Sequence, residues 1–180
     1  KKTETPEDAQ QNYENQKALA IASFRRGNFK QALTEVEEAQ KMNDQDAEIY
    51  LIKGAIYFKL KDYPLAEDNY KKAIAINPSY TAARFTLCGL YLVEKKYQEA
   101  ISECEAVVAD PAYAARANAY TNIGAAYFGL GDMVKAREYY EKALQINPSF
   151  VYARTSWGSS TWQPEITHRR RQRSFPVLMS

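Results

Sequence analysis

Apolar residues recur along most of this chain at spacings of three and four, the period of helices that bury one face. Turn-forming pairs interrupt this pattern at intervals, namely Gly27-Asn28, Lys61-Asp62 and Gly131-Asp132. Asp62 and Asp132 are suited to cap the helices that follow them, and Pro78 and Pro148 are placed to end the helices that precede them. The pattern predicts an all-α protein built from antiparallel helix pairs.

One stretch of sequence occurs twice: residues 70–80 read YKKAIAINPSY and residues 140–150 read YEKALQINPSF. A period of 34 residues then divides the chain into four units, at 13–46, 47–80, 81–114 and 117–150. Most units carry small residues at positions 8, 20 and 27, where the two helices of one unit would come closest. A repeat of this length predicts stacked helix pairs, each of which buries its apolar face against the next pair.

The placing of these small residues, with large residues at positions 11 and 24, resembles the tetratricopeptide repeat (TPR). Agreement is strong in units 47–80 and 117–150, fair in the first unit and weaker in the third. The resemblance implies a right-handed superhelical solenoid of four helix–turn–helix repeats, with a concave groove lined by the first helix of each repeat. We expect a truncated fifth helix at 151–158, so that the TPR domain covers 13–158.

Both ends of the chain depart from the repeat. Residues 1–12 are polar and are interpreted either as an N-terminal tether or as a frayed chain end; Lys1 in place of Met indicates a processed or excised chain. Residues 159–180 form an irregular basic tail that contains no lysine and holds the chain's one histidine, His168. We interpret this tail either as non-native sequence, such as a frameshift product, or as a genuine basic segment for nucleic acid or anionic lipid.

Charge also separates the body from the tail. Residues 1–150 carry 19 Lys and Arg against 21 Asp and Glu, whereas residues 151–180 have a net charge of +4. The nearly neutral body gives no reason to expect a nucleic-acid or membrane partner. No stretch of the sequence approaches the roughly 20 apolar residues that a membrane-spanning helix needs.

The sequence offers little for catalysis, because His168 lies in the tail and no glycine-rich phosphate loop occurs. Cys88 and Cys104 occupy facing helices of one unit, and we interpret them either as buried thiols or as a disulfide, which would suit the periplasm. Two cysteines 16 residues apart do not make a zinc pattern. We therefore expect no enzyme, cofactor, metal or small-molecule substrate.

The positions that line the groove in the TPR family are mostly apolar here, with a ladder of Phe side chains and amides at one end. The candidate partner-binding residues are Lys17, Ile21, Phe24, Leu51, Ala55, Phe58, Phe85, Thr86, Leu92, Asn118, Thr121, Asn122 and Phe128. Chaperone-binding TPR proteins hold a carboxylate with Lys and Asn, but Ile21 and Ile52 stand where Asn is expected. The groove is therefore expected to bind an extended or amphipathic protein segment, with packing between helices as the alternative for any single ring.

Two extra residues separate the third and fourth units. Asp110 is interpreted as an N-cap and Pro111 as the first helical residue, so the first helix of the fourth unit is expected to start early. This stretch, with Arg116, YTNIG at 120–124 and KAREYY at 135–140, resembles the PilF/PilW family of type IV pilus biogenesis proteins. These are outer-membrane TPR lipoproteins that pilot the secretin and support its assembly into a ring.

This second resemblance implies a non-enzymatic scaffold in the periplasm, tethered to the outer membrane, that grips a secretin subunit in its groove. Two alternatives stay open: a general TPR adaptor for another complex, cytoplasmic if the resemblance fails, and a regulatory TPR paired with an enzyme or transcription factor. Since a truncated solenoid exposes an apolar end, self-association through the C-terminal end is also expected.

Overall fold

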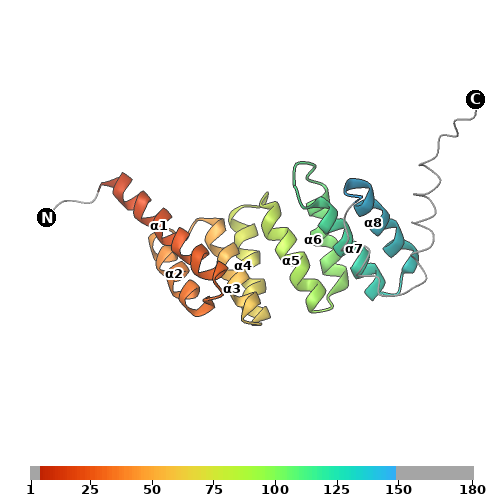
Figure 1. The fold of residues 1–180 in the computed structure, drawn as a ribbon, viewed down its shortest axis with the longest axis horizontal. Coiled ribbons are helices and arrows are strands. Elements are labelled where there is room, and N and C mark those ends of the chain that lie inside the picture. Colours follow the sequence, from red (N-terminus) through yellow and green to blue (C-terminus); the bar gives the residue numbers. More distant parts are fainter. Residues whose placement is uncertain (1–4, 149–180) are drawn as a thin grey trace, which may run out of the picture.

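A computed structural model describes residues 5–148 of the chain. Within this range the chain forms eight helices, α1 (Pro6–Arg25), α2 (Phe29–Met42), α3 (Ala47–Lys59), α4 (Tyr63–Ile76), α5 (Thr81–Val93), α6 (Tyr97–Val108), α7 (Arg116–Gly129) and α8 (Met133–Ile146). Successive helices run antiparallel as four pairs, and the pairs stack into an elongated solenoid (Figure 1). The predicted all-α fold of four helix–turn–helix repeats is confirmed. The predicted fifth helix and the tail lie outside the described residues.

The stacking gives the solenoid two edges, which are seen as the lower and upper sides of Figure 1. The turns inside the pairs, at 26–28, 60–62, 94–96 and 130–132, lie along the lower side, which we call the turn edge. The connections between pairs, at 43–46, 77–80 and 109–115, lie along the upper side, which we call the loop edge. The first helices α1, α3, α5 and α7 contact one another in sequence and form one face, which we call the first-helix face.

The turns inside the pairs have the chemistry that the sequence predicts. Each contains a residue with positive φ, which is glycine at Gly27 and Gly131 but lysine at Lys61 and Lys95. The lysines accept the left-handed conformation at a cost of about 1–2 kcal/mol each. The predicted caps are confirmed, because the carboxylates of Asp62 and Asp132 accept hydrogen bonds from the first-turn backbones of α4 and α8.

Helix α1 begins earlier than the first repeat unit. Thr5 and Asp8 form a reciprocal capping box, and Pro6 occupies the first turn, where its missing N–H costs nothing. Residues 6–12, which the sequence assigns to a polar tether, are therefore the first turns of α1. These turns are exposed, and the role of residues 1–12 as a tether stays a prediction.

The helices of each pair meet where a small residue faces a large one. Gly54 on α3 packs against the ring of Tyr70 on α4, and Gly124 on α7 packs against Tyr140 on α8. Both tyrosines are 3% exposed. The rings fill the space that the glycines leave, so in these two pairs the large residue at position 24 packs against the small residue at position 8 of the same unit.

Unit three closes differently at the same two positions. Cys88 on α5 and Cys104 on α6 form a disulfide, with their Cα atoms 5.6 Å apart and both side chains fully buried. The structure thus selects one of the two interpretations that the sequence left open. The covalent bond stands where unit two places the contact of Gly54 with Tyr70, and it closes the repeat whose sequence departs most from the pattern.

The expected early start of α7 is wrong, because the helix begins at Arg116 and Asp110 lies in the preceding loop. The Asp110 carboxylate accepts a hydrogen bond from the Ala112 backbone and another, at 2.7 Å, from the Thr81 hydroxyl on α5. The ring of Tyr113 packs against Phe85, with centroids 5.9 Å apart. These contacts with α5 hold residues 110–115 as a folded loop rather than as a longer helix.

Glu67 on α4 joins units two and three. Its carboxylate accepts hydrogen bonds from Lys71, from the Tyr91 hydroxyl at 3.1 Å and from Lys96 at 2.9 Å. Burial works to raise the pKa of Glu67, but the bonds from Lys71, Lys96 and Tyr91 outweigh it and hold the pKa at about 2. The predicted Glu67–Lys71 and Glu138–Lys142 pairs are both confirmed.

Two glycines on first helices provide a matched test of this packing. An added Cβ at Gly54 would lie 2.5 Å from the Tyr70 ring, whereas one at Gly89 on α5 would meet nothing within 4 Å. We expect Gly54→Ala to lower the free energy of unfolding by about 1–3 kcal/mol, and Gly89→Ala to raise it by about 0.5–1 kcal/mol. Urea unfolding measures both, and equal effects of the two substitutions would contradict the packing described.

Glu67 predicts part of the acid sensitivity of the fold. Its pKa in the folded chain lies below the ordinary 4.5, so its stabilisation is complete above pH 4.5 and is lost as the pH falls towards 2. We expect Glu67→Gln to cost about 1–3 kcal/mol at pH 7 and to flatten the loss of stability between pH 5 and pH 3. The control is Glu38→Gln, which breaks an exposed ion pair with Lys41. Urea unfolding of both variants is measured at pH 7 and between pH 5 and pH 3. A cost no larger than that of the control would refute this role of Glu67.

Candidate functional site: the first-helix face

The predicted groove residues all come from the four first helices, and the fold brings these helices together in one row. They are Lys17, Ile21 and Phe24 on α1, Leu51, Ala55 and Phe58 on α3, Phe85, Thr86 and Leu92 on α5, and Asn118, Thr121, Asn122 and Phe128 on α7. Most are half-buried, while Asn118 and Phe128 are exposed. The row is thus neither a closed core nor a fully solvated surface, and partner binding by these residues remains a proposal.

The middle of the first-helix face is shallow because the ninth position of these repeats, which lies there, carries a small residue. Ala55, Gly89 and Ala125 occupy equivalent places on α3, α5 and α7, and all three are half-buried. Around Gly89 there is open space, since a Cβ added there would have no neighbour within 4 Å. The face can therefore admit a side chain from outside at α5 without moving the backbone.

The predicted Phe ladder is present, and three of its rings are held by a second aromatic ring. The pairs, with centroid distances of 5.7, 5.7 and 5.9 Å, are Phe24 with Phe29, Phe58 with Tyr63, and Phe85 with Tyr113. The fourth ring, Phe128, is 44% exposed near the turn edge. Each of these three rings is part of the packing of the repeats and is also accessible in part.

One predicted contact residue does not face outward. Thr121 is 1% exposed, and its hydroxyl donates a hydrogen bond of 3.0 Å to the Ala117 carbonyl on the same helix. Bonding to the carbonyl of the preceding turn is how a buried threonine in a helix satisfies its hydroxyl. Thr121 therefore belongs to the packing of α7 and is removed from the candidate contacts.

Lys17 is enclosed by acidic groups of this chain. Its ammonium lies 3.2 Å from Glu14, 3.1 Å from Asp46 and 2.9 Å from Glu48, and its side chain is 12% exposed. Burial works to lower the pKa of Lys17, but the hydrogen bonds that its ammonium donates to these carboxylates outweigh it and raise the pKa above its ordinary value.

The same cluster ties α1 to the start of α3. Asp46 caps α3 by accepting a hydrogen bond from the Glu48 backbone, and it also accepts the Tyr13 hydroxyl at 2.5 Å. Burial would raise the pKa of Asp46, but these hydrogen bonds and that of Lys17 lower it. With three carboxylates already around it, Lys17 has no role left in holding a partner's carboxylate. The sequence identified Lys17 but gave no signal that Asp46 and Glu48 reach it.

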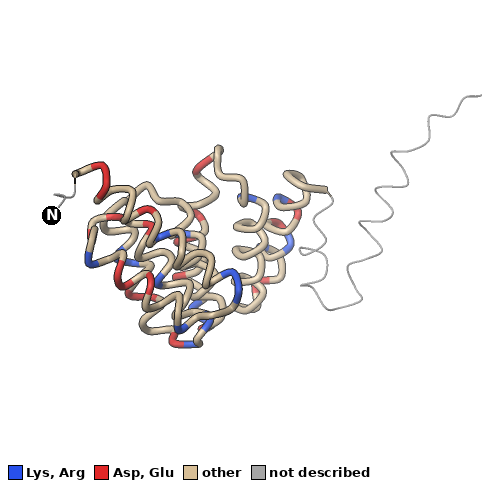
Figure 2. The backbone as a smooth tube through the Cα atoms, turned by 60° about the vertical axis from the view of Figure 1, so that its left-hand side comes forward, with Lys and Arg blue, Asp and Glu red and all other residues tan. Residues whose placement is uncertain are grey.

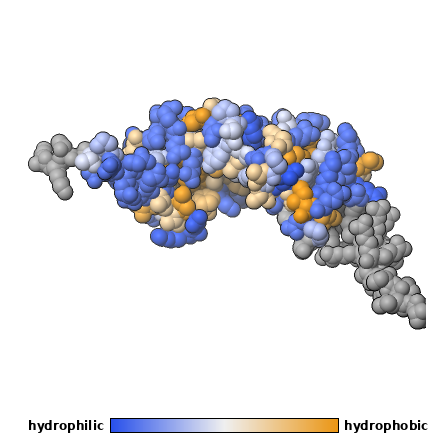
Figure 3. All heavy atoms as spheres, turned by 90° about the horizontal axis from the view of Figure 1, so that it is seen from above, coloured by the Kyte–Doolittle hydropathy of each residue, from blue (hydrophilic) through white to orange (hydrophobic). Residues whose placement is uncertain are grey.

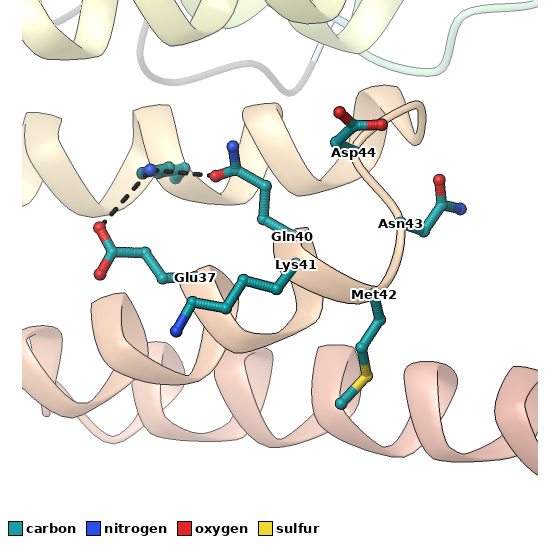
Figure 4. Close-up of a pocket in the computed structure, with 7 residues that line it drawn as sticks. Glu37, Gln40, Lys41, Met42, Asn43 and Asp44 are labelled. Atoms are coloured by element: carbon teal, nitrogen blue, oxygen red, sulfur yellow. Dashed lines mark hydrogen bonds and ion pairs between the residues drawn. The ribbon is translucent and has the colours of Figure 1, made fainter.

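A cavity of about 610 Å³ lies away from this face, between the end of α2 and α3. Figure 4 shows that the side chains of Glu37 and Gln40 point away from that of Met42. Lys53 donates to Gln40 at 3.1 Å and lies 3.5 Å from Glu37. These polar groups satisfy one another, so the hollow has no converging set of unused groups for a small molecule.

The described residues give two further results that bear on function. In residues 5–148, no group of three or more His, Cys, Asp or Glu side chains is arranged to hold a metal ion. No helix in that range is both long enough and apolar enough to cross a membrane.

Comparison with known proteins now gives the class. A family model for the tetratricopeptide repeat matches residues 47–80 and 117–150. The two matched segments are tetratricopeptide repeats, and the chain has the fold of a TPR solenoid, a kind of fold that serves as a protein-interaction scaffold.

Among individual proteins, the chain is similar to the type IV pilus assembly protein PilF of Pseudomonas aeruginosa. The two are 24% identical over 129 residues, which cover 72% of this chain and 51% of PilF. The solved structure of P. aeruginosa PilF superposes with a TM-score of 0.78 at 20% identity, covering 91% of this chain and 71% of that one. The chain thus spans about half the length of the curated PilF sequence.

Two further solved structures share the fold. PilW, described as a widely conserved type IV pilus biogenesis factor, gives a TM-score of 0.74 at 23% identity, over 79% of this chain and 66% of PilW. YrrB, described as a TPR protein with an unusual peptide-binding site, gives 0.69 at 26% identity, over 78% of this chain and 71% of YrrB. At these identities the likeness to PilF and PilW concerns the fold.

Proposed function

We propose that this protein is a non-enzymatic scaffold whose first-helix face binds a segment of another protein, and that this partner is a secretin subunit during type IV pilus assembly. The observation that carries the proposal is the open space around Gly89, on a face to which Phe58 of α3 and Phe85 of α5 contribute half-buried rings. Fixed aromatic rings beside a shallow floor suit an extended or amphipathic segment, since large rigid rings supply most of the energy in such contacts.

The client is inferred from similarity to PilF and PilW, which are named as type IV pilus proteins. The shared feature that the sequence singles out is the insert before α7, which the structure folds as a loop on α5. Tyr113 of this loop packs on Phe85, so the insert shapes the first-helix face itself. A general TPR adaptor for another complex is the alternative.

The disulfide between Cys88 and Cys104 supports a periplasmic location. Structural disulfides persist in oxidising compartments such as the periplasm and are rare in the reducing cytosol. Together with the similarity to PilF, this favours a chain that works at the periplasmic side of the outer membrane, tethered there by a segment outside the described residues.

Gly89→Arg tests the first-helix face without disturbing the helix. The new side chain would fill the open space, and replacing a helical glycine favours α5. In the native host with the gene deleted, we expect a wild-type copy to restore heat-resistant secretin multimers and Gly89→Arg to restore less than about a tenth of them, as a more than tenfold loss of affinity gives when the site is not saturated. Ala75→Arg, at an exposed position of α4, is the matched control and should restore them fully.

The outcomes separate the two parts of the proposal. Unchanged secretin multimers on deletion would refute the piloting role and leave the adaptor. Multimers that need the gene but tolerate Gly89→Arg would place the secretin contact elsewhere on the solenoid. Circular dichroism of both arginine variants checks that the fold is retained.

The aromatic rings give a second, independent test. We expect Phe58→Ala combined with Phe85→Ala to weaken partner binding by about 2–4 kcal/mol, because two anchor rings are lost, with little change in helicity at room temperature. Titration of the purified secretin subunit measures the binding, and circular dichroism measures the helicity. Loss of the folded state in the double variant would show that these rings act as core, and Phe128→Ala, at an exposed ring, would then be the variant to compare.

A further inference from the structure

The turn edge concentrates apolar side chains that nothing in the solenoid covers. Of the ten large hydrophobic side chains that are exposed in the described residues, six lie in or beside the turns inside the pairs: Leu60, Leu65, Val93, Leu130, Met133 and Val134. Val134 is 79% exposed, the highest of the ten. A single exposed Leu is ordinary, but a row along one edge indicates a surface that another body contacts.

The same edge is basic. Residues 25–30, 59–65, 93–97 and 129–135 contain eight Lys and Arg against three Asp and Glu, a net charge of +5. The basic residues are Arg25, Arg26, Lys30, Lys59, Lys61, Lys95, Lys96 and Lys135. Lys96 is paired with Glu67 and Glu94, while Lys59, Lys61 and Lys95 are exposed. Figure 2 shows several of the basic positions towards the lower side of the tube, where the turns lie.

The loop edge has the opposite character. Residues 43–48, 77–81 and 109–116 contain four acidic side chains against one arginine, a net charge of −3. Two cavities of the described residues are lined in part by this edge, one beside Asp44 and the other beside Asp110. Seen from above, onto this edge, the surface is mainly hydrophilic (Figure 3). A chain whose body is nearly neutral overall is thus polarised across its width.

We propose that the turn edge docks on the surface of an anionic lipid bilayer. Apolar tips alternating with lysines are the composition of interfacial membrane-binding surfaces, where apolar groups enter the headgroup boundary and cations meet anionic lipid. Lys59 and Lys61 flank Leu60, and Lys95 lies two residues after Val93, so their ammonium groups can stay at headgroup level while the stems follow the apolar surface. The turns form an extended row, and the lining of the two cavities described above comes from other parts of the chain.

This surface is separate from the first-helix face and does not depend on the proposed secretin contact. Docking by the turn edge would lay the long axis of the solenoid along the membrane. The first-helix face would then stand beside the bilayer, open to a partner in the same plane.

The experiment is co-sedimentation of the full chain with vesicles of phosphatidylethanolamine and phosphatidylglycerol, and with vesicles of phosphatidylcholine alone, at low salt. We expect binding to the anionic vesicles and at least tenfold weaker binding to the neutral ones. Lys59→Gln combined with Lys95→Gln should reduce the affinity for anionic vesicles about 25-fold, at about fivefold per cation. Lys41→Gln combined with Lys72→Gln removes the same charge from exposed sites off this edge and should change the affinity by no more than about twofold.

Two further variants isolate the cause of binding. Met133→Ser combined with Val134→Ser keeps the charge and should weaken binding at least fivefold, because the apolar tips are lost. Replacing Arg169, Arg170 and Arg171 by Gln removes charge from the tail. Binding that disappears with the tail variant but survives the turn-edge variants would overturn the proposal, as would absence of binding to anionic vesicles. Equal loss in the two lysine pairs would reduce the effect to net charge and also overturn it.

Discussion

The constraint on which this structure depends is that no helix pair can bury its own apolar surface. Within a pair, a small residue on one helix packs against a larger group on the other helix. The pair then stacks on the next pair through its remaining apolar residues. In units two and four, the rings of Tyr70 and Tyr140 pack against Gly54 and Gly124. In unit three, a disulfide takes the place of this contact. Because closure is local, the inner row of helices is free to vary. That freedom allows the floor at Gly89 to stay open while the fold is maintained around it.

Because each pair closes within itself, adjacent repeats need further contacts between them to keep their register. Direct polar bridges join them at particular places, as Glu67 does between units two and three, and as the cluster around Lys17 does between units one and two. In both cases a charged residue of an early helix meets groups of a later one in a partly buried site. The ionisation of these groups is then part of the stacking free energy, which makes stability depend on pH through side chains that are not catalytic.

The sequence predicted what depends on spacing and local chemistry. The four repeats, the caps by Asp62 and Asp132 and the pair Glu67–Lys71 all follow from residues close together in the chain. It did not predict the particular contacts between residues that are distant in the chain.

Asp110 has the local signature of an N-cap, but the Thr81 hydroxyl, 29 residues away, engages its carboxylate. Thr121 occupies a groove position by number, yet its helix turns it into the packed side. The nearly neutral net charge of residues 1–150 did not reveal that the turn edge is basic and the loop edge acidic. The two sets of charges separate only because the fold places the turns and the loops on opposite edges.

A solenoid with a distinct face and a distinct edge can perform two tasks without interference, because the residues for each come from different parts of every repeat. The floor of the first-helix face, at Ala55, Gly89 and Ala125, comes from the middle of the first helices, while the turn edge draws on the residues that link the two helices of a pair. A change in one set leaves the other in place, as the absence of neighbours around Gly89 illustrates for the face. Holding one body along the turn edge also fixes the direction in which the face opens, and it reduces the orientational freedom that a partner in the same plane must give up on binding.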